Sequence, residues 1–450
     1  MNLTRKKKIS FFLAIMKDKK LFSSTLYKDR LGHFYILDNA GSIMPAVSDT
    51  TYTSLFCFTC KLKEDINKDK LQIALEKTIK RYKYLYCKLK KGLFWYYLEE
   101  IEKKPKIEDD IEPACTNYSI FSSPLFRVRA KEKRISVEFS HALTDGTGAI
   151  EFLKTLLFEY FSILGYNLPS TNITIASSPI DNEEFEDGYK KYYEQNIPKP
   201  DPLPIAFHIP GKVLPKHTYR VIFGYCKVDQ VLKVAKSKNL TLTEFLSAIY
   251  IYSLQQIYFS IDESKRRRYS PFIAFETPIN LRKIHPSKTM RNFSLFLISR
   301  IDCRMGRYSL EEIFELTHLQ MQTELKKKEH LKMIKRNVAS EYIFALRLVP
   351  LFLKVLVLRS AFYYLGDGLI TGFLSNIGKI DLDPVYFEYI DYFDFIPAPG
   401  KASKTNCSVV SFDNKLSIAF GSRTEEKELE RIFFSTLVSL GIEVHVTIKF

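Results

Sequence analysis

The pattern of apolar and polar residues divides most of the chain into short strands and amphipathic helices. Residues 134–140 alternate strictly between apolar and polar side chains, which predicts a half-buried strand. After residue 148 the apolar positions recur at helical spacing, so we expect a long helix to follow this strand. His141 continues the apolar parity of the strand, and its ring should therefore point inward.

The same patterns predict further elements along the chain. Strands are expected at residues 52–62, 84–89, 93–98, 219–228, 272–277, 293–301, 373–378, 407–412 and 416–420. Helices are expected after Asn67, after Thr241 (where Glu244 completes a capping-box signature), over 183–196 and over 425–440. Residues 30–50 are expected to form a loop. Because both halves mix strands and helices, the predicted fold class is α/β, an α+β two-layer sandwich.

Length and one proline-rich segment predict two subdomains. The chain has 450 residues, more than a single hydrophobic core usually covers. Residues 197–204 alternate proline with other residues and cannot continue a helix or a sheet. We therefore expect an N-terminal subdomain at 1–196, a proline-rich linker at 197–218, and a C-terminal subdomain with crossover segments at 219–450.

Composition and charge limit the class of protein. Hydrophobic residues make up 46% and charged residues 26% of the chain, which is ordinary for a globular protein. The net charge of +16 indicates a solvated basic surface or attraction of a polyanionic partner, such as a phosphate-bearing cofactor or an acidic carrier protein. No nucleic-acid-binding signature occurs, so nucleic acid is not expected as a partner. The seven cysteines lack framework spacing, which predicts a reducing, cytoplasmic location.

No apolar run is long enough to span a bilayer without interruption by charge. The nearest, residues 346–365, contains Arg347, Lys354 and Arg359. We interpret it as a pair of packed helices, and weak contact of a surface helix with a membrane stays open as the alternative. Residues 5–16 imitate a short signal peptide, but lysines follow at once without a small-residue cleavage site, so export is not expected.

One short motif carries candidate chemistry. Residues 140–146 read Ser-His-Ala-Leu-Thr-Asp-Gly, which places a histidine at a strand end and an aspartate and a glycine where a helix begins. Histidine is the side chain best suited to moving protons near neutral pH. Taken alone, His141 is as readily a packed core residue, and Asp145 as readily a helix cap. No metal-ligand spacing and no phosphate-binding glycine loop accompany the motif, so no metal is expected.

Five short stretches together resemble one superfamily. They are residues 124–128 (Pro-Leu-Phe-Arg-Val), 140–146, 278–282 (Pro-Ile-Asn-Leu-Arg), 291–293 (Arg-Asn-Phe) and 374–378 (Leu-Ser-Asn-Ile-Gly). In this order they are similar to the condensation-domain and chloramphenicol-acetyltransferase-like superfamily, and most to its alcohol-acetyltransferase-like and polyketide-associated branch. The resemblance covers the chain from about Gly32 onward. It implies two similar subdomains in a V, with the active site in a tunnel between them.

The resemblance also implies roles for single residues. His141 would be the general base toward an acceptor hydroxyl or amine. The donor would be an acyl thioester on coenzyme A or on the phosphopantetheine of an acyl carrier protein, with no cofactor bound permanently. Asp145 would be mainly structural and would pair with Arg282, and Gly146 would permit the turn.

Three further residues are candidates for substrate binding. Ser375 and Asn376 are expected to line the acceptor side or to help stabilise an oxyanion, although a strand-end turn explains them equally well; Ser140 is the third. Condensation domains of peptide synthetases usually have two adjacent histidines, whereas Ser140 precedes His141 here, which favours the single-histidine acyltransferases. The only tryptophan, Trp95, lies far from the position of the plant-type Asp-Phe-Gly-Trp-Gly motif.

The sequence therefore predicts an acyl-CoA-dependent O-acyltransferase that transfers an acyl group to a small alcohol or amine in a ternary complex. One alternative is a free-standing condensation-type enzyme that uses carrier-bound acyl groups to form amides or esters. A second is a non-catalytic binding module of the same fold. A third is a protein that binds membranes or nucleic acid through its charge.

Overall fold

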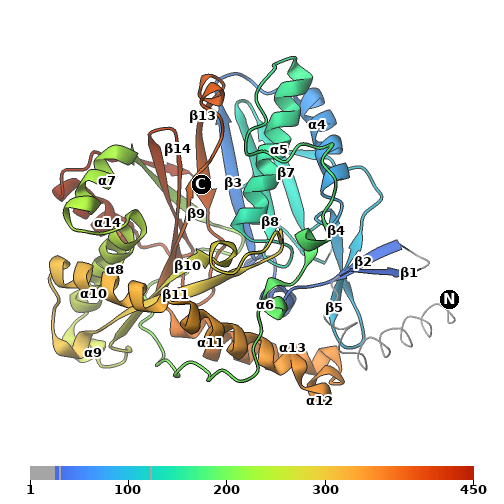
Figure 1. Ribbon diagram of the computed structural model, residues 1–450. Helices are drawn as coiled ribbons and strands as arrows, with labels where there is room; N and C mark the ends of the chain where they lie inside the picture. Colours follow the sequence, from blue (N-terminus) through green and yellow to red (C-terminus); the bar gives the residue numbers. More distant parts are fainter. Residues whose placement is uncertain (1–25, 30–31, 122–123, 450) are drawn as a thin grey trace.

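The structure, a computed structural model, describes residues 26–29, 32–121 and 124–449 of the chain. Two large sheets lie side by side with helices on their outer faces, and a smaller third sheet flanks the first (Figure 1). The expected α/β fold class is confirmed. One large cluster of buried apolar residues contains residues from both halves of the chain, and a second lies within residues 207–442. The division into subdomains at 1–196 and 219–450 stays a prediction, and the two parts built on the large sheets are called the first and second subdomain below.

The first subdomain is built on a five-stranded sheet with the order β13-β3-β8-β7-β6. Its strands are β3 (Leu55–Leu62), β6 (Ile107–Asp109), β7 (Phe126–Lys131), β8 (Arg134–Ser140) and β13 (Ile390–Ile396). Helices α4 (Lys68–Arg81) and α5 (Gly146–Leu164) cover one face. There Phe139 of β8 meets Phe152 of α5 with ring centroids 5.3 Å apart. Strand β13 comes from the C-terminal half of the chain, so this sheet joins the two subdomains.

A four-stranded antiparallel sheet with the order β1-β2-β5-β4 lies beside the first subdomain. Its strands are β1 (Leu26–Asp29), β2 (Gly32–Ile36), β4 (Cys87–Lys91) and β5 (Tyr96–Glu100), and the short helices η1 (Gly41–Ile43) and α3 (Met44–Val47) follow β2. The predicted loop over residues 30–50 is therefore wrong. Strand β2 forms because it pairs with β5, which is distant in the sequence. So short a strand shows no recognisable alternation of apolar and polar residues, because its pairing partner decides its conformation.

The second subdomain is built on a seven-stranded sheet with the order β11-β10-β12-β14-β15-β9-β16. Its strands are β9 (Arg220–Lys227), β10 (Phe272–Asn280), β11 (Ser294–Asp302), β12 (Gly372–Lys379), β14 (Thr405–Phe412), β15 (Lys415–Ser422) and β16 (His445–Lys449). Helices α7 (Val228–Ser237), α8 (Leu242–Ser260), α10 (Leu310–Glu324) and α14 (Glu428–Ser439) lie on its outer side (Figure 1). The capping box predicted for α8 is confirmed, since Thr241 Oγ1 accepts from Glu244 N at 3.2 Å and Glu244 Oε2 accepts from Thr241 N at 2.8 Å.

The segments between the subdomains are mostly irregular. Residues 197–218 contain no helix and only one isolated bridge, Val213 to Thr424. The predicted helix over 183–196 is replaced by η2 (Asn182–Phe185) and α6 (Gly188–Lys191), because Asp181 and Asp187 each cap a new start. The remaining short helices are α9 (Glu263–Arg266), η3 (Leu281–Lys283), η4 (Cys303–Met305), η6 (Asp367–Leu369) and η7 (Pro384–Glu388).

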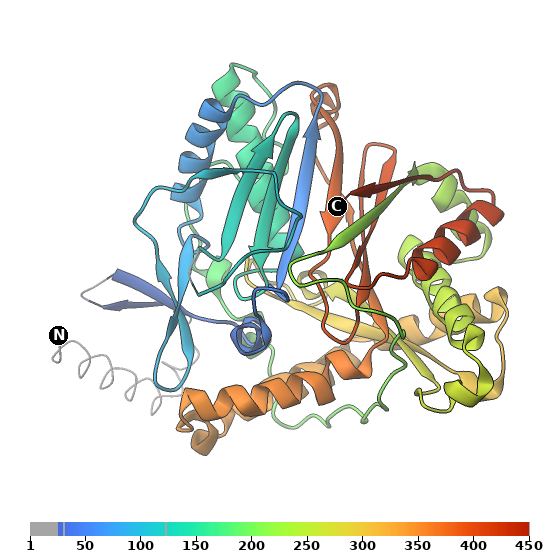
Figure 2. The same cartoon turned by 180° about the vertical axis from the view of Figure 1, so that it is seen from behind.

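A helical segment runs along one edge of the molecule, at the bottom of both views (Figure 1 and Figure 2). It consists of α11 (Lys327–Val338), η5 (Ala339–Tyr342), α12 (Phe344–Arg347) and α13 (Leu351–Leu365). None of the helices in the described ranges combines the length and the hydropathy that a membrane crossing needs.

Strand β8 has the predicted boundaries, but it is buried on both faces. Its polar face carries Glu138, whose carboxylate contacts Arg127 Nη2 at 3.0 Å and also Arg129. The second subdomain covers this face, because Val221 of β9 lines the same small cavity as Arg129. The expectation of a half-buried strand was wrong. Alternation shows which side chains are polar, but it does not show whether other parts of the protein cover the polar face. Paired charges allow the polar face to be buried as well.

Candidate active site

His141 directly follows the last residue of β8, where the two subdomains meet. Its backbone N–H donates to Ser54 O at 3.1 Å, and its ring lies against Phe56 of β3 with centroids 4.5 Å apart. The neighbours Ser140 and Ala142 are both 0% exposed, whereas His141 keeps partial exposure. The imidazole is thus held on one side by packing against Phe56, while the residue as a whole keeps partial exposure.

Asn292, just before β11, contacts both the backbone and the ring of His141. Its Nδ2 donates to His141 O at 2.9 Å and to Asp38 Oδ2 at 2.9 Å, and its Oδ1 lies 3.4 Å from His141 Nδ1. The orientation of the amide follows from its partners, since a carbonyl and a carboxylate both require a donor. Oδ1 therefore faces Nδ1, which must carry the ring proton. This tautomer leaves Nε2 as the basic nitrogen of His141.

Asp38, between β2 and η1, holds the amide of Asn292 in place. Its carboxylate accepts from Asn292 N at 3.3 Å and from Gly41 N at 2.7 Å, in addition to the bond from Asn292 Nδ2. Burial, aided by the charge of Asp187, raises the pKa of Asp38 to about 7. A buried polar chain therefore runs from Asp38 through Asn292 to His141.

Sequence reasoning assigned no role to Asp38 or Asn292. Asn292 lies in the stretch 291–293 that carries the family likeness, so the resemblance marked its neighbourhood but not its function. Asp38 fell in the segment expected to be a loop, 254 positions from Asn292. Nothing local in the sequence relates two residues at that separation.

Asp145 caps α5 and ties it to the second subdomain. Its Oδ1 accepts from Thr147 N at 3.1 Å and from Gly148 N at 3.3 Å. Arg282 approaches the same carboxylate with Nη1 at 2.9 Å from Oδ2 and Nη2 at 3.2 Å from Oδ1. The ion pair that the resemblance implies is thus present. These bonds direct the carboxylate into the structure, and a two-pronged Arg–carboxylate pair is a strong way to fasten a turn.

Arg282 also binds the loop that carries Asn292. Its Nε donates to Thr289 O at 2.7 Å, and its Nη2 donates to Arg291 O at 2.5 Å. One guanidinium therefore connects the start of α5 with residues 289–291. Because Asn292 comes next in the chain, the Asp145–Arg282 pair also fixes the residue that contacts the His141 ring.

The two glycines at the start of α5 permit a close approach of the subdomains. A Cβ on Gly146 would lie 2.5 Å from Ile377 Cδ1 of β12, and a Cβ on Gly148 would lie 2.5 Å from Met290 O. Both distances are shorter than a side chain can tolerate without a shift of its neighbour. The expected structural importance of Gly146 thus has a steric explanation in this arrangement.

Ser140 serves the turn that carries His141. Its Oγ lies 3.0 Å from Ser54 Oγ and accepts from Ala142 N at 3.2 Å. Because Ser140 is fully buried, these contacts place its hydroxyl within the strand-to-turn junction. Its proposed contact with substrate remains a prediction.

Asn376 and Ser375 lie on opposite faces of β12. Asn376 Nδ2 donates to Thr243 Oγ1 of α8 at 3.0 Å, so Asn376 faces the outer helices. The alternation of a strand directs Ser375 to the other face. Ile377 follows at an irregularity in the pairing with β14, and its side chain approaches Gly146. The structure thus brings the strand face of Ser375 toward the motif, whereas Asn376 bonds to α8.

The surroundings of His141 favour a neutral imidazole. Burial lowers its pKa from the ordinary value of 6.5. The bond with Asn292, the charge of Asp145 and a hydrogen bond with the Thr144 backbone oppose this shift only in part. A neutral ring with Nδ1 protonated can accept a proton at Nε2, which is the requirement for a general base.

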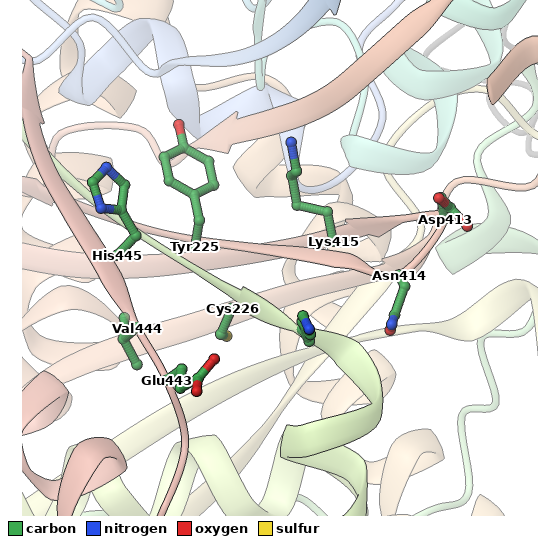
Figure 3. Close-up of a pocket in the computed structure, with 9 residues that line it drawn as sticks. Tyr225, Cys226, Asp413, Asn414, Lys415, Glu443, Val444 and His445 are labelled. Atoms are coloured by element: carbon green, nitrogen blue, oxygen red, sulfur yellow. The ribbon is translucent and has the colours of Figure 1, made fainter. Parts of the chain in front are cut away.

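One surface groove lies away from the motif. A surface groove of about 560 Å³ is lined by residues 225–227, 413–415 and 443–445. Figure 3 shows Tyr225 and Lys415 on one side of the strands and Cys226 and Glu443 on the other. Tyr225 Oη donates to Asp394 at 3.1 Å, and Lys415 pairs with Asp391 at 2.8 Å. Since these polar groups already bond within the protein, the groove is a poor candidate for catalysis.

The part of the chain that the structure describes contains no cluster of metal-binding side chains. Within it, no three His, Cys, Asp or Glu side chains gather as an ion would require.

Comparison with solved structures defines the class of fold. The chain shares its fold with two solved acetyltransferase-type structures and a condensation domain, in agreement with the resemblance in the sequence. The structure of TRI101 from F. graminearum, complexed with coenzyme A and deoxynivalenol, matches 91% of this chain and 98% of its own, with a TM-score of 0.60 and 11% identity. TRI3 trichothecene 15-O-acetyltransferase from Fusarium sporotrichioides matches 93% of this chain and 97% of its own, with a TM-score of 0.56 and 9% identity.

A third solved structure is a condensation domain. The starter condensation domain of rhizomide synthetase RzmA matches 91% of this chain and 96% of its own, with a TM-score of 0.51 and 12% identity. No family model and no curated protein sequence matches the chain. At these identities the likeness establishes a shared fold, and activity has to be argued from the site.

Proposed function

We propose that this protein is an acyltransferase that moves an acyl group from an acyl-CoA thioester to an alcohol acceptor. His141 is its general base, and both substrates are bound together when the transfer occurs. The observation that best supports this role is the contact of Asn292 Oδ1 with His141 Nδ1 at 3.4 Å. It leaves a basic Nε2 on a partly exposed residue, between β8 and the segment that precedes β11.

The proposed reaction needs one proton acceptor and no covalent enzyme intermediate. Nε2 of His141 takes the proton of the acceptor hydroxyl as its oxygen attacks the thioester carbonyl. The tetrahedral intermediate then expels the thiolate, which receives the proton back from Nε2. A positioned base of this kind contributes roughly a hundred- to ten-thousandfold in rate, and holding two substrates together lowers the entropic barrier further.

The other predicted residues receive supporting roles in this proposal. Asp145, Gly146 and Arg282 fix the turn and the approach of the subdomains. Ser375, on the strand face that turns toward the motif, is proposed to donate a hydrogen bond to the oxyanion. The net charge of +16 favours capture of a phosphate-bearing donor such as coenzyme A.

Release of free thiol tests the proposal. The purified chain is incubated with acetyl-CoA or octanoyl-CoA and a panel of primary alcohols and amines, and the coenzyme A thiol is titrated. We expect acceptor-dependent release that His141→Ala abolishes, while thermal melting stays nearly unchanged because the residue is partly exposed. An active His141→Ala variant would contradict the assignment of the base.

The likeness to a starter condensation domain supports one alternative, a condensation-type enzyme that uses carrier-bound donors. The same assay with acyl groups loaded on a carrier protein separates the two. Turnover with the carrier and none with free acyl-CoA favours the alternative. A binding module of the same fold would bind coenzyme A and release no thiol with either donor.

A further inference from the structure

Large apolar side chains are exposed along α12 and α13. Four of them on α13 are more than half exposed: Phe352 at 70%, Val357 at 67%, Tyr364 at 63% and Leu356 at 61%. Phe344 of α12 is 50% exposed as well. The expected pair of helices is present here, but much of its apolar surface is not packed against the protein. Contiguous exposed apolar surface of this kind usually marks an interaction site.

The polarity of α13 is inverted relative to an ordinary surface helix. Arg359 Nε donates to Ala46 O at 2.7 Å, and Lys354 Nζ donates to Phe94 O at 2.9 Å. Both side chains thus bond to neighbouring elements, although Arg359 also keeps an exposed surface beside the outward apolar side chains. The partial burial of Lys354 lowers its pKa to about 8, which agrees with its inward direction.

The apolar surface continues onto the turn between β4 and β5. Leu351 N at the start of α13 donates to Leu93 O at 2.8 Å, and Leu93 itself is 54% exposed. This bond places the turn beside the start of α13, and we name the exposed apolar residues of α12, α13 and this turn the α13 face. It belongs to elements far apart in the sequence that the fold brings together.

Charge and length indicate which occupant fits the α13 face. Residues 343–365 contain three basic residues and no acidic residue. Arg347 and Lys354 bond inward, whereas Arg359 is exposed on α13. Three further exposed lysines, residues 326–328, lie at the start of α11 in the same helical segment. A second copy would set two strongly basic chains against each other, since the net charge is +16. Anionic lipid headgroups attract such residues.

The dimensions of α13 fit a helix lying on a bilayer. It has 15 residues and is therefore about 22 Å long, too short to cross the hydrocarbon core. Its C-terminal end carries Tyr363 and Tyr364, an aromatic type that prefers the interface between lipid and water. An apolar outward face and a basic surround are the features of helices that lie in that interface.

We propose that the α13 face is a docking surface for membranes with anionic headgroups, with α13 lying in the plane of the interface. This inference does not depend on the proposed acyl transfer. Docking there would bring the protein to substrates dissolved in lipid. The α13 face is connected to the candidate active site, since Arg359 of α13 bonds to Ala46 of α3, and α3 and η1 follow Asp38 in the chain.

Vesicle flotation tests the proposal with a matched pair of double variants. Leu356→Gln/Val357→Gln alters the α13 face. Leu319→Gln/Val438→Gln changes the same residue types on α10 and α14, where each is 55% exposed. The full-length chain is floated with phosphatidylcholine vesicles that contain or lack phosphatidylserine. We expect the wild type and the control to float with the anionic vesicles and the α13 variant to lose about tenfold in partition.

Several outcomes would overturn the proposal. A wild type that does not float with anionic vesicles would contradict it. Equal flotation of the two double variants would also contradict it, because binding would then depend on charge alone. A wild type that stays in solution as a dimer, and becomes a monomer in the α13 variant, would assign the face to a second copy. Melting curves check that the variants fold, and Phe352→Ser provides a second change on the same face. His141→Ala should float like the wild type, so failure of the proposed function would be recognised separately.

Discussion

Asn292 bonds to His141 at two points, its Nδ2 donating to the carbonyl oxygen at 2.9 Å and its Oδ1 lying 3.4 Å from ring Nδ1. One amide side chain therefore defines both the position and the tautomer of the imidazole. Asp38 fixes that amide through Nδ2 at 2.9 Å, which prevents the amide from turning over. The direction of the basic nitrogen is thus built into the fold before any substrate arrives.

Asn292→Ala should leave His141 present but free to change tautomer and rotamer. We expect kcat to fall by about ten- to a thousandfold with little change in KM, because the loss concerns the protonation of the base and not the binding of substrate. Steady-state kinetics with a saturating donor measure the split. A folded variant with unchanged kcat would show that Asn292 does not position the base.

A comparison of sequence and structure explains why the histidine was found and its partners were not. Alternation over residues 134–140 gave the boundaries of β8, and therefore the place of His141 at its end. The partner of Asp145 followed from the family resemblance, which pointed to Arg282. Asp38 meets Asn292 only through folding, so no periodicity connects them. Packed helices were favoured over a surface helix for residues 346–365, because hydrophobic spacing alone does not tell which side of a helix is covered.

Asp145→Ala should destabilise the protein, since it removes the helix cap and leaves Arg282 without its carboxylate. Breaking a buried pair on one side costs about 3–5 kcal/mol. Arg282→Ala should cost a similar amount, and the double variant less than the sum, because the two changes remove one shared interaction. Urea unfolding of the four proteins measures the coupling. If Asp145→Asn melts like the wild type and yet has no activity, the structural role of this aspartate is wrong.

The pH dependence of acyl transfer should reflect the neutral state of His141. Burial lowers the pKa of this imidazole from its ordinary value of 6.5, so the base stays unprotonated into mildly acidic solution. We expect the acid limb of kcat/KM, which reports the free enzyme, to lie below pH 6.5. An acid limb above that value would mean that a charged neighbour outweighs burial in the folded protein.

Stability at alkaline pH should depend on Glu276 of β10. Burial, together with the charge of Asp367, raises its pKa from 4.5 to about 8, and Arg336 opposes the shift. The native state therefore holds a proton that the unfolded chain releases, so this contribution to stability is lost as the pH rises from 4.5 through about 8. Glu276→Gln stays neutral and should lack this loss. Its melting temperature should exceed that of the wild type above pH 8, and an equal decline in both proteins would contradict the assignment.

Gly146→Ala tests the close approach of α5 and β12. The added methyl group would lie 2.5 Å from Ile377 Cδ1, so we expect a loss of about 1–3 kcal/mol in stability from overpacking. Ile377→Val removes the clashing carbon and should cost little alone, about 0.5–1.5 kcal/mol. The double variant should therefore be more stable than Gly146→Ala by itself. The contact is with the flexible end of the Ile377 side chain, which can move aside. The recovery of stability in the double variant is therefore a sharper test than the loss in Gly146→Ala alone. A double variant as unstable as the sum of the two changes would mean that Gly146 is required for its backbone and not for the space beside Ile377.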